Sequence, residues 1–166
     1  LFAREKTGRG QKVDVSLLDG MVSLLTYQAE MYLACGKIPR RMGNQHPTIS
    51  PYETFQAKDG YLNIAVGSEK LWSLFCDEIG MPNLKADKRF LLNKDRVKNR
   101  NKLFAILSRV VRKKKVGEWL SRFEHAGIPA GPILSVDKIL NHPQILARQM
   151  VQEVSHLPMP LQFAQA

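Results

Sequence analysis

Two short stretches near the middle of the chain alternate apolar and polar residues, the pattern of a half-buried β-strand. The first covers residues 52–57 and the second covers residues 61–66. Between them, Lys58-Asp59-Gly60 supplies an Asp-Gly pair, and glycine readily takes the positive φ that tight turns require. The pattern therefore predicts an antiparallel β-hairpin over residues 52–66.

Apolar residues recur at helical spacing on both sides of this hairpin. Before it, Ser16 is placed to cap a helix that ends near Gly36. After it, Ser68 can cap a helix that Gly80 and Pro82 bring to an end. Helical patterns follow over residues 85–115, 116–126, 135–140 and 143–149.

Four further segments have no helical periodicity. Residues 12–15 alternate like a short strand, and residues 150–154 are compatible with a last strand. Residues 128–133 are too rich in proline for a central strand but suit an edge strand or a tight passage near a ligand. Residues 37–51 contain three prolines, which indicates an extended linker or loop. The order of elements predicts a small α+β module.

The length of 166 residues suits one ordinary domain, which can bury roughly 70% of its unfolded surface. The chain opens without Met, and residues 1–4 resemble the last turn of a helix, so we expect a fragment of a larger protein. No apolar run approaches the ~20 residues of a membrane span, and no signal segment opens the chain. Cys35 and Cys76 have no CxxC spacing, which predicts two small core residues in a cytoplasmic protein.

Positive charge is concentrated in one part of the chain. Residues 85–115 hold thirteen Lys or Arg and two Asp or Glu, whereas the whole chain has a formal charge of +10. One interpretation is a surface that attracts a polyanion such as nucleic acid or a phosphate-rich cofactor. The other is the solvated face of a helix whose apolar side points to the core.

Few residues suggest catalytic chemistry by spacing alone. The four histidines do not pair at metal-ligand spacing, so no metal site is predicted. GxSxG, Walker and GxGxxG patterns are absent from the sequence, and Gly8-Arg9-Gly10 is a plain turn. Asp14 and Asp19 flank a strand-to-helix junction, where a carboxylate could act as a base or a nucleophile. The favoured interpretation is structural: Asp14 lies on the polar face of a strand, and Asp19 interacts with the positive end of a helix.

The stretch Gly43-Asn44-Gln45-His46-Pro47 is the most suggestive loop. Glycine and asparagine tolerate unusual backbone angles, and the Asn and His side chains offer hydrogen bonds. Loops of this type can close over a reacting centre, although an ordinary surface loop has the same composition.

Several segments together resemble the family III CoA-transferases, the CaiB/BaiF group that includes formyl-CoA transferase. The resemblance extends in order over nearly the whole chain. The matching segments are residues 4–11, 13–19, 43–47, 51–52, 55–60 and 87–90, then Arg96, Asn99 and Arg100, and finally residues 126–132 and 142–144.

The resemblance implies an α/β fold with a Rossmann-like large domain, an inserted small domain and an interlocked homodimer. By this pattern, residues 1–36 would be the end of the large-domain portion, with a strand and a helix. Residues 37–50 would form the linker, residues 51–154 the small α+β domain with a short antiparallel sheet, and residues 155–166 the return linker.

The resemblance also implies an enzyme that moves CoA from an acyl-CoA to a carboxylic acid through an aspartyl intermediate. The nucleophilic aspartate is expected before Leu1, so neither Asp14 nor Asp19 takes that role and the chain alone is expected to be inactive. CoA thioester would be a substrate and no cofactor would be tightly bound; nucleic acid and membrane partners are not implied.

Within this chain, the resemblance assigns Gly43, Asn44, Gln45 and His46 to a loop that closes over the intermediates. This loop has one glycine where formyl-CoA transferase has several. A racemase-like enzyme of the same fold and a basic nucleic-acid-binding module remain as alternatives.

Overall fold

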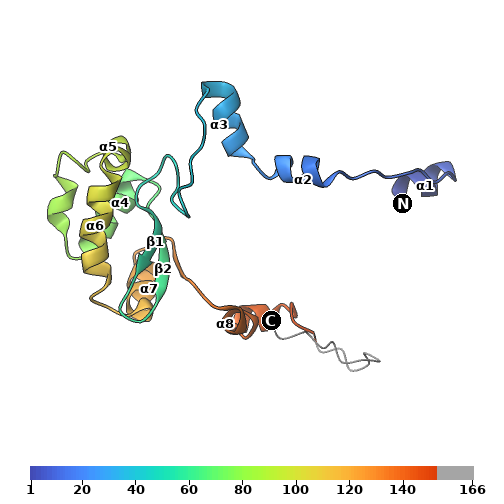
Figure 1. Ribbon diagram of the computed structural model, residues 1–166. Helices are drawn as coiled ribbons and strands as arrows, with labels where there is room; N and C mark the ends of the chain where they lie inside the picture. Colours follow the sequence, from blue (N-terminus) through green and yellow to red (C-terminus); the bar gives the residue numbers. More distant parts are fainter. Residues whose placement is uncertain (153–166) are drawn as a thin grey trace, which may run out of the picture. The chain divides into compact units, whose positions relative to one another are not determined.

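A computed structural model describes residues 1–152 of the protein. The chain divides into two compact units, Leu1–Gly43 and Asn44–Ala166 (Figure 1). The first unit contains helices, whereas the second contains a small sheet and the helices that pack on it.

Three short helices make up the first unit: α1 (Phe2–Thr7), α2 (Leu17–Ser23) and α3 (Tyr27–Cys35). Ser16 caps α2 as predicted, because its hydroxyl oxygen accepts a hydrogen bond from the Asp19 backbone N–H at 3.3 Å. The single helix predicted up to Gly36 is instead interrupted after α2. Thr26 has a φ of 44°, which a β-branched residue rarely adopts and which no continuous helix allows.

The strand predicted over residues 12–15 is wrong. Residues 9–16 have no regular secondary structure, and the sheet formed by the described residues contains strands from the second unit alone. Alternation along one segment does not make a strand, because a strand needs a neighbour to take its backbone hydrogen bonds.

The second unit is built on a three-stranded antiparallel sheet in the order β1-β2-β3. Strands β1 (Tyr52–Gln56) and β2 (Tyr61–Ala65) form the predicted hairpin, in which Phe55 faces Leu62. The short edge strand β3 (Ala130–Pro132) pairs with β2, and this confirms the prediction of an edge strand in the proline-rich segment.

Helices cover one face of this sheet, which we call the inner face. Helix α6 (Arg100–Val111) contacts β1, and α7 (Val116–His125) contacts β3 and α4 (Glu69–Glu78) (Figure 1). Side chains of both layers form one apolar core. Its fully buried members include Phe55, Leu62, Ile64, Val66, Phe75, Phe90, Leu107, Val111 and Phe123. The predicted small α+β module is therefore confirmed.

The basic stretch over residues 85–115 is not one helix. It contains the end of a 3-10 helix (Pro82–Lys85), then α5 (Asn93–Lys98) and α6. Asn99, with φ −104° and ψ 22°, separates α5 from α6. The apolar residues of α6 do face the core as predicted, since Leu103, Leu107 and Val111 are buried.

The described chain ends after two short helices, α8 (Val136–Leu140) and α9 (Pro143–Ala147). Pro143 occupies the first turn of α9, as predicted. Residues 150–152 are not in a strand, and the rest of the strand predicted over residues 150–154 lies outside the described residues, as does the return linker at 155–166. Over residues 1–152, no helix has the length and apolar character needed to cross a bilayer.

Candidate active site

The loop that carries the predicted site residues enters β1 directly. Gly43 has a φ of 63°, a left-handed conformation that residues with a side chain rarely adopt, so glycine is favoured here by the backbone. It is the last residue of the first unit, and Asn44 is the first residue of the second. Asn44, Gln45 and His46 each contact a different residue of β1.

Asn44 is fixed to the outer face of the sheet, the face opposite the helices. Thr54 and Asn63 lie side by side on this face, because they are register partners across β1 and β2. The Thr54 N–H donates to Asn44 Oδ1 at 3.3 Å. Asn44 Nδ2 donates to Thr54 Oγ1 and, at 2.7 Å, to Asn63 Oδ1. We call Asn44, Thr54 and Asn63 the amide cluster.

Gln45 reaches a carboxylate on the inner face. Its Nε2 donates to Glu53 Oε2 at 2.5 Å, and Glu53 is only 3% exposed. Burial raises the pKa of Glu53, while the hydrogen bond from Gln45 and the positive charge of Arg100 act in the opposite direction. Gln45 therefore supplies a partner to a carboxylate that would otherwise be costly to bury.

His46 packs against Tyr52 at the start of β1. The two rings are stacked, with centroids 5.2 Å apart and planes inclined by 10°. The His46 N–H donates to the Tyr52 carbonyl at 3.0 Å, and His46 Nδ1 accepts from the Thr48 N–H at 3.3 Å. Both the backbone and the ring of His46 are thus held in place.

Two buried arginines from the basic stretch hold the following part of the loop. Arg100 Nη2 donates to the carbonyl oxygens of His46 and Ile49. Arg96 Nε donates to the Ser50 carbonyl at 2.8 Å. Charge counting alone left two interpretations of this stretch, a surface for a polyanion or a solvated helix face. The family pattern that includes Arg96 and Arg100 was the sequence signal for a different role. The structure gives both arginines a structural function.

The other carboxylates weighed from the sequence lie in the first unit. Asp14 forms an exposed ion pair with Lys12 at 3.5 Å. Asp19 is in the first turn of α2, where its negative charge interacts favourably with the positive end of the helix dipole. The described structure surrounds neither carboxylate with other candidate catalytic groups.

The two cysteines have different environments. Cys76 is a buried core residue as predicted, and burial raises the pKa of its thiol to about 12. The same prediction is wrong for Cys35, which is exposed because α3 buries none of its residues within the described chain. Over residues 1–152, no group of three His, Cys, Asp or Glu side chains could hold a metal ion.

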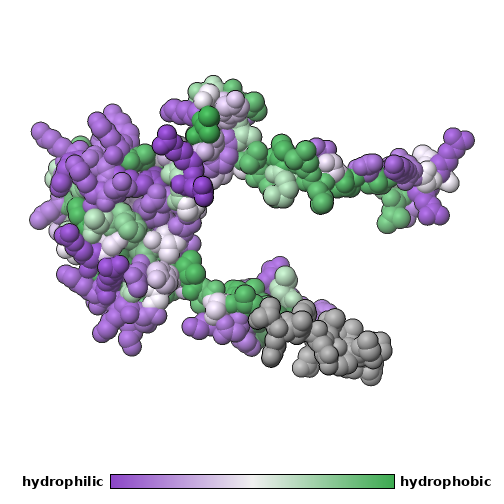
Figure 2. Space-filling view, viewed as in Figure 1, coloured by the Kyte–Doolittle hydropathy of each residue, from purple (hydrophilic) through white to green (hydrophobic). Residues whose placement is uncertain are grey.

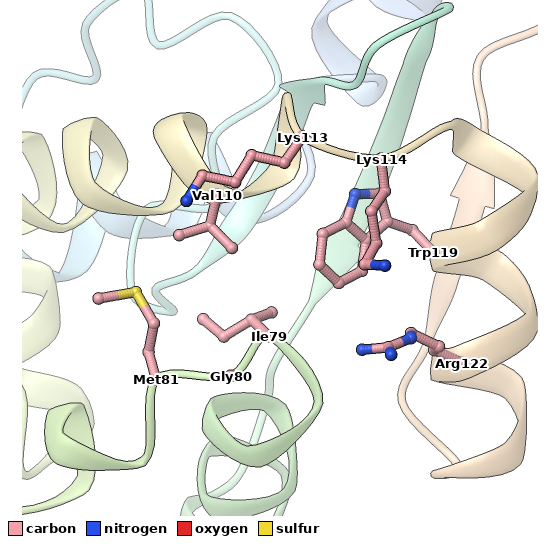
Figure 3. A pocket seen from close by; sticks show the side chains of 8 residues that line it. All are labelled: Ile79, Gly80, Met81, Val110, Lys113, Lys114, Trp119 and Arg122. Atoms are coloured by element: carbon pink, nitrogen blue, oxygen red, sulfur yellow. The ribbon is translucent and has the colours of Figure 1, made fainter.

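A separate cavity of about 370 Å³ lies among α4, α6 and α7 of the second unit (Figure 3). Apolar side chains, among them Ile79 and Trp119, line it together with Lys113, Lys114 and Arg122. Arg122 Nη1 donates to the Glu78 carbonyl at 3.0 Å. This hydrogen bond gives a partner to a carbonyl oxygen at the C-terminal end of α4. This cavity contains none of the loop residues 43–46.

The family model for CoA-transferase family III matches residues 1–166. The chain belongs to this family. Acetyl-CoA:oxalate CoA-transferase from Acetobacter aceti is 40% identical over 160 residues, which cover 96% of this chain and 41% of the relative. Succinyl-CoA:glutarate CoA-transferase from Mus musculus is 37% identical over 156 residues, covering 94% of this chain and 36% of the relative.

Solved structures agree with this family III assignment. The crystal structure of a CaiB/BaiF family protein from Brucella suis matches with a TM-score of 0.81 and 39% identity. The match covers 99% of this chain and 44% of that protein. The resemblance to family III CoA-transferases is confirmed, and the chain spans about two fifths of the length of the relatives it matches.

Proposed function

We propose that the intact protein transfers CoA from an acyl-CoA to a carboxylic acid. The observation that carries the proposal is the 40% identity, over nearly the whole chain, to an acetyl-CoA:oxalate CoA-transferase. A second relative is named for succinyl-CoA and glutarate. Both names describe exchange between a CoA thioester and a small carboxylic acid, so the same class of substrates is proposed here.

The proposed reaction uses an aspartate upstream of Leu1 as its nucleophile. Its carboxylate attacks the acyl-CoA thioester carbonyl, the C–S bond breaks, and a mixed anhydride and CoA thiolate result. The thiolate attacks the aspartyl carbonyl, which releases the donor acid and leaves an aspartyl-CoA thioester. The acceptor carboxylate displaces the thiolate, and the thiolate then takes the new acyl group and restores the aspartate.

Within this scheme, Asn44 and His46 lie beside the acyl group of the intermediates, and Gly43 and Gln45 belong to the same loop. The contacts of the loop support a fixed arrangement, since Asn44 is bound to Thr54 and His46 is stacked on Tyr52. Groups that are held in place before substrate binds lose less conformational freedom in the transition state.

We also propose the interlocked homodimer, with each site shared between the large domain of one subunit and the small domain of the other. Apolar side chains on the first unit support a covering partner. Figure 2 shows hydrophobic residues at the surface of α2 and α3, and Leu17, Leu18 and Leu33 are each more than 70% exposed. Apolar surface of this kind is covered in an intact protein, and a second subunit is one surface that can cover it.

The test of the proposed site is the double variant Asn44→Ala/His46→Ala in the full-length protein. Its kcat for CoA transfer from acetyl-CoA to oxalate, or from succinyl-CoA to glutarate, is expected to fall at least tenfold, the scale of one lost positioning group. The matched control is Asn101→Ala/His125→Ala, which removes the same side-chain types from exposed helical positions. Equal kcat in the two double variants would contradict the role of the loop.

A racemase of the same fold predicts a different product. Such an enzyme removes and returns a proton at the α-carbon, so in D₂O it would introduce deuterium into a 2-methylacyl-CoA without transferring CoA. We expect transfer and no deuterium exchange. Mass spectrometry of the recovered thioester separates the two activities.

A further inference from the structure

We propose that the side-chain NH₂ group of Asn63 donates a hydrogen bond to a carboxylate oxygen of the acid substrate. The inference rests on the proposed function, because it takes the loop at residues 43–46 to face the reacting groups. It adds Asn63, a strand residue outside that loop, as a residue that positions the substrate.

The orientation of Asn63 follows from the hydrogen bonds of the amide cluster. The Thr54 N–H can only donate, so the Asn44 atom that faces it is the amide oxygen, and Asn44 Nδ2 faces the other way. Two donors then converge on Asn63: Asn44 Nδ2 at 2.7 Å and the Thr54 hydroxyl at 2.5 Å. The Asn63 atom between them must accept, so it is the oxygen.

In this arrangement, every polar atom of the Asn44 and Thr54 side chains takes part in a hydrogen bond. Asn63 Oδ1 accepts twice, which fills both lone pairs. Within residues 1–152, Asn63 Nδ2 has no protein acceptor. Asn63 therefore carries the one group of the cluster whose two N–H bonds are available to a ligand.

The neighbouring position on β3 leaves space next to this donor. Asn63 is the register partner of Gly131, and directly paired residues of antiparallel strands project from the same face. A Cβ placed on Gly131 would meet no atom within 4 Å. The outer face thus has a bare position beside Asn63, where a small carboxylate can approach.

The same face also carries the proposed site residues. Asn44 is bound to Asn63, and His46 is stacked on Tyr52, which lies two residues before Thr54 on the same face of β1. A substrate group that lies beside Asn44 and His46 is therefore within the reach of a donor on this face. An N–H donor to a carboxylate is a charge-assisted hydrogen bond, stronger than one between neutral groups.

The variant Asn63→Asp in the full-length protein tests the inference. Aspartate keeps an oxygen for Thr54 and Asn44, and it replaces the NH₂ group by a negatively charged oxygen. The KM for the acid substrate is expected to rise at least tenfold, with a smaller effect on the KM for the CoA thioester. Probes are acetyl-CoA with oxalate and succinyl-CoA with glutarate. The control Asn101→Asp adds the same charge on the exposed surface of α6 and should leave both KM values unchanged.

A second variant covers the case in which Asn63→Asp does not fold. Gly131→Val fills the space beside Asn63, and the open surroundings of Gly131 and the β-propensity of valine favour normal folding. This variant should also raise the KM for the acid. If either variant folds and its KM for the acid substrate is unchanged, the proposed role of Asn63 is overturned, and the proposed transferase activity is unaffected. An inactive wild-type enzyme overturns the proposed function and this inference with it.

Discussion

Arg96 forms an ion pair with Glu69, with 2.8 Å between Nη1 and Oε2, although the two side chains differ sharply in burial. Arg96 is fully buried, whereas the Glu69 side chain is about half exposed. Arg96 Nη2 also donates to Glu69 Oε1 at 3.2 Å, and three backbone carbonyls, those of Ser50, Phe90 and Leu91, accept the remaining hydrogen bonds of Arg96. The arginine therefore serves mainly to satisfy buried carbonyl groups, and the carboxylate is one partner among several.

Removing Arg96 and removing Glu69 should have unequal effects on the free energy of unfolding. Arg96→Met leaves the three carbonyls without their donor, so the free energy of unfolding should fall by about 2–4 kcal/mol. Glu69→Gln removes a half-exposed charge and keeps an amide oxygen that can accept from Arg96, so its effect should be smaller, about 1 kcal/mol. Urea unfolding followed by circular dichroism measures both values. Equal losses would show that the ion pair itself, and not the set of carbonyl contacts, stabilises this region.

The carboxyl group of Glu53 gives stability a specific dependence on pH. Burial raises the pKa of Glu53 above its usual value of 4.5. Between 4.5 and the raised pKa, the folded state binds more protons than the unfolded state, so the stability from this group falls as pH rises through that window. Glu53→Gln cannot ionise and should gain stability relative to wild type as pH increases from 4 to 7.

The measurement for Glu53 is the urea midpoint of both proteins at intervals across this pH range. Glu124→Gln, a change at an exposed position of α7, is the control for altered net charge. A constant difference between wild type and Glu53→Gln would mean that Glu53 titrates alike in the folded and unfolded states.

Two glycines, one in the first turn of α7 and one just after its end, should respond in opposite directions to alanine. Gly127 has a φ of 67° just after the helix, and alanine in this left-handed conformation should cost about 1 kcal/mol. Gly117 is in the first turn of α7, and a Cβ there meets no atom within 4 Å. Gly117→Ala should raise the free energy of unfolding by about 0.5 kcal/mol, through the lower chain entropy of the unfolded state. Thermal and urea unfolding of the two variants provide the comparison.

Cys76 should not react with thiol reagents while the protein is folded. Its side chain is buried and the pKa of about 12 leaves roughly one thiol in ten thousand ionised at pH 8. In a Cys35→Ser variant, Ellman's reagent should detect no thiol in buffer and one thiol per chain in urea. Rapid labelling in buffer would indicate that the core around α4 opens locally.

Local patterns in the sequence predicted the parts of the fold that depend on neighbouring residues. The hairpin was predicted correctly because the alternation in residues 52–57 and 61–66 and the Asp-Gly turn all lie within 15 residues. The N-caps Ser16 and Ser68 were also correct, since a cap bonds to a backbone N–H three residues later. Residues 12–15 have the same kind of alternation, but the described part of the chain places no strand beside them, so the local signal was misleading.

The contacts that fix the candidate site depend on distant residues. Arg100 and its acceptor His46 are 54 positions apart, and Asn63 lies 19 positions from Asn44. Hydrogen bonds over such separations have no periodic signature, because they depend on how the sheet and the helices pack. The roles of Asn44, Gln45 and His46 in the reaction remain predictions, while their contacts with β1 are now known.

The anchoring of the loop also bears on how substrate would enter the site. Asn44, Gln45 and His46 are each bound to β1, and β1 shares its core with α6. A flap motion of these residues alone would break all three sets of contacts at once. Opening by rigid-body displacement of the whole sheet-and-helix unit keeps them intact, and such domain motions occur in microseconds to milliseconds. Access to the proposed site would then require Asn44, Gln45 and His46 to move together with β1 and the helices packed on it.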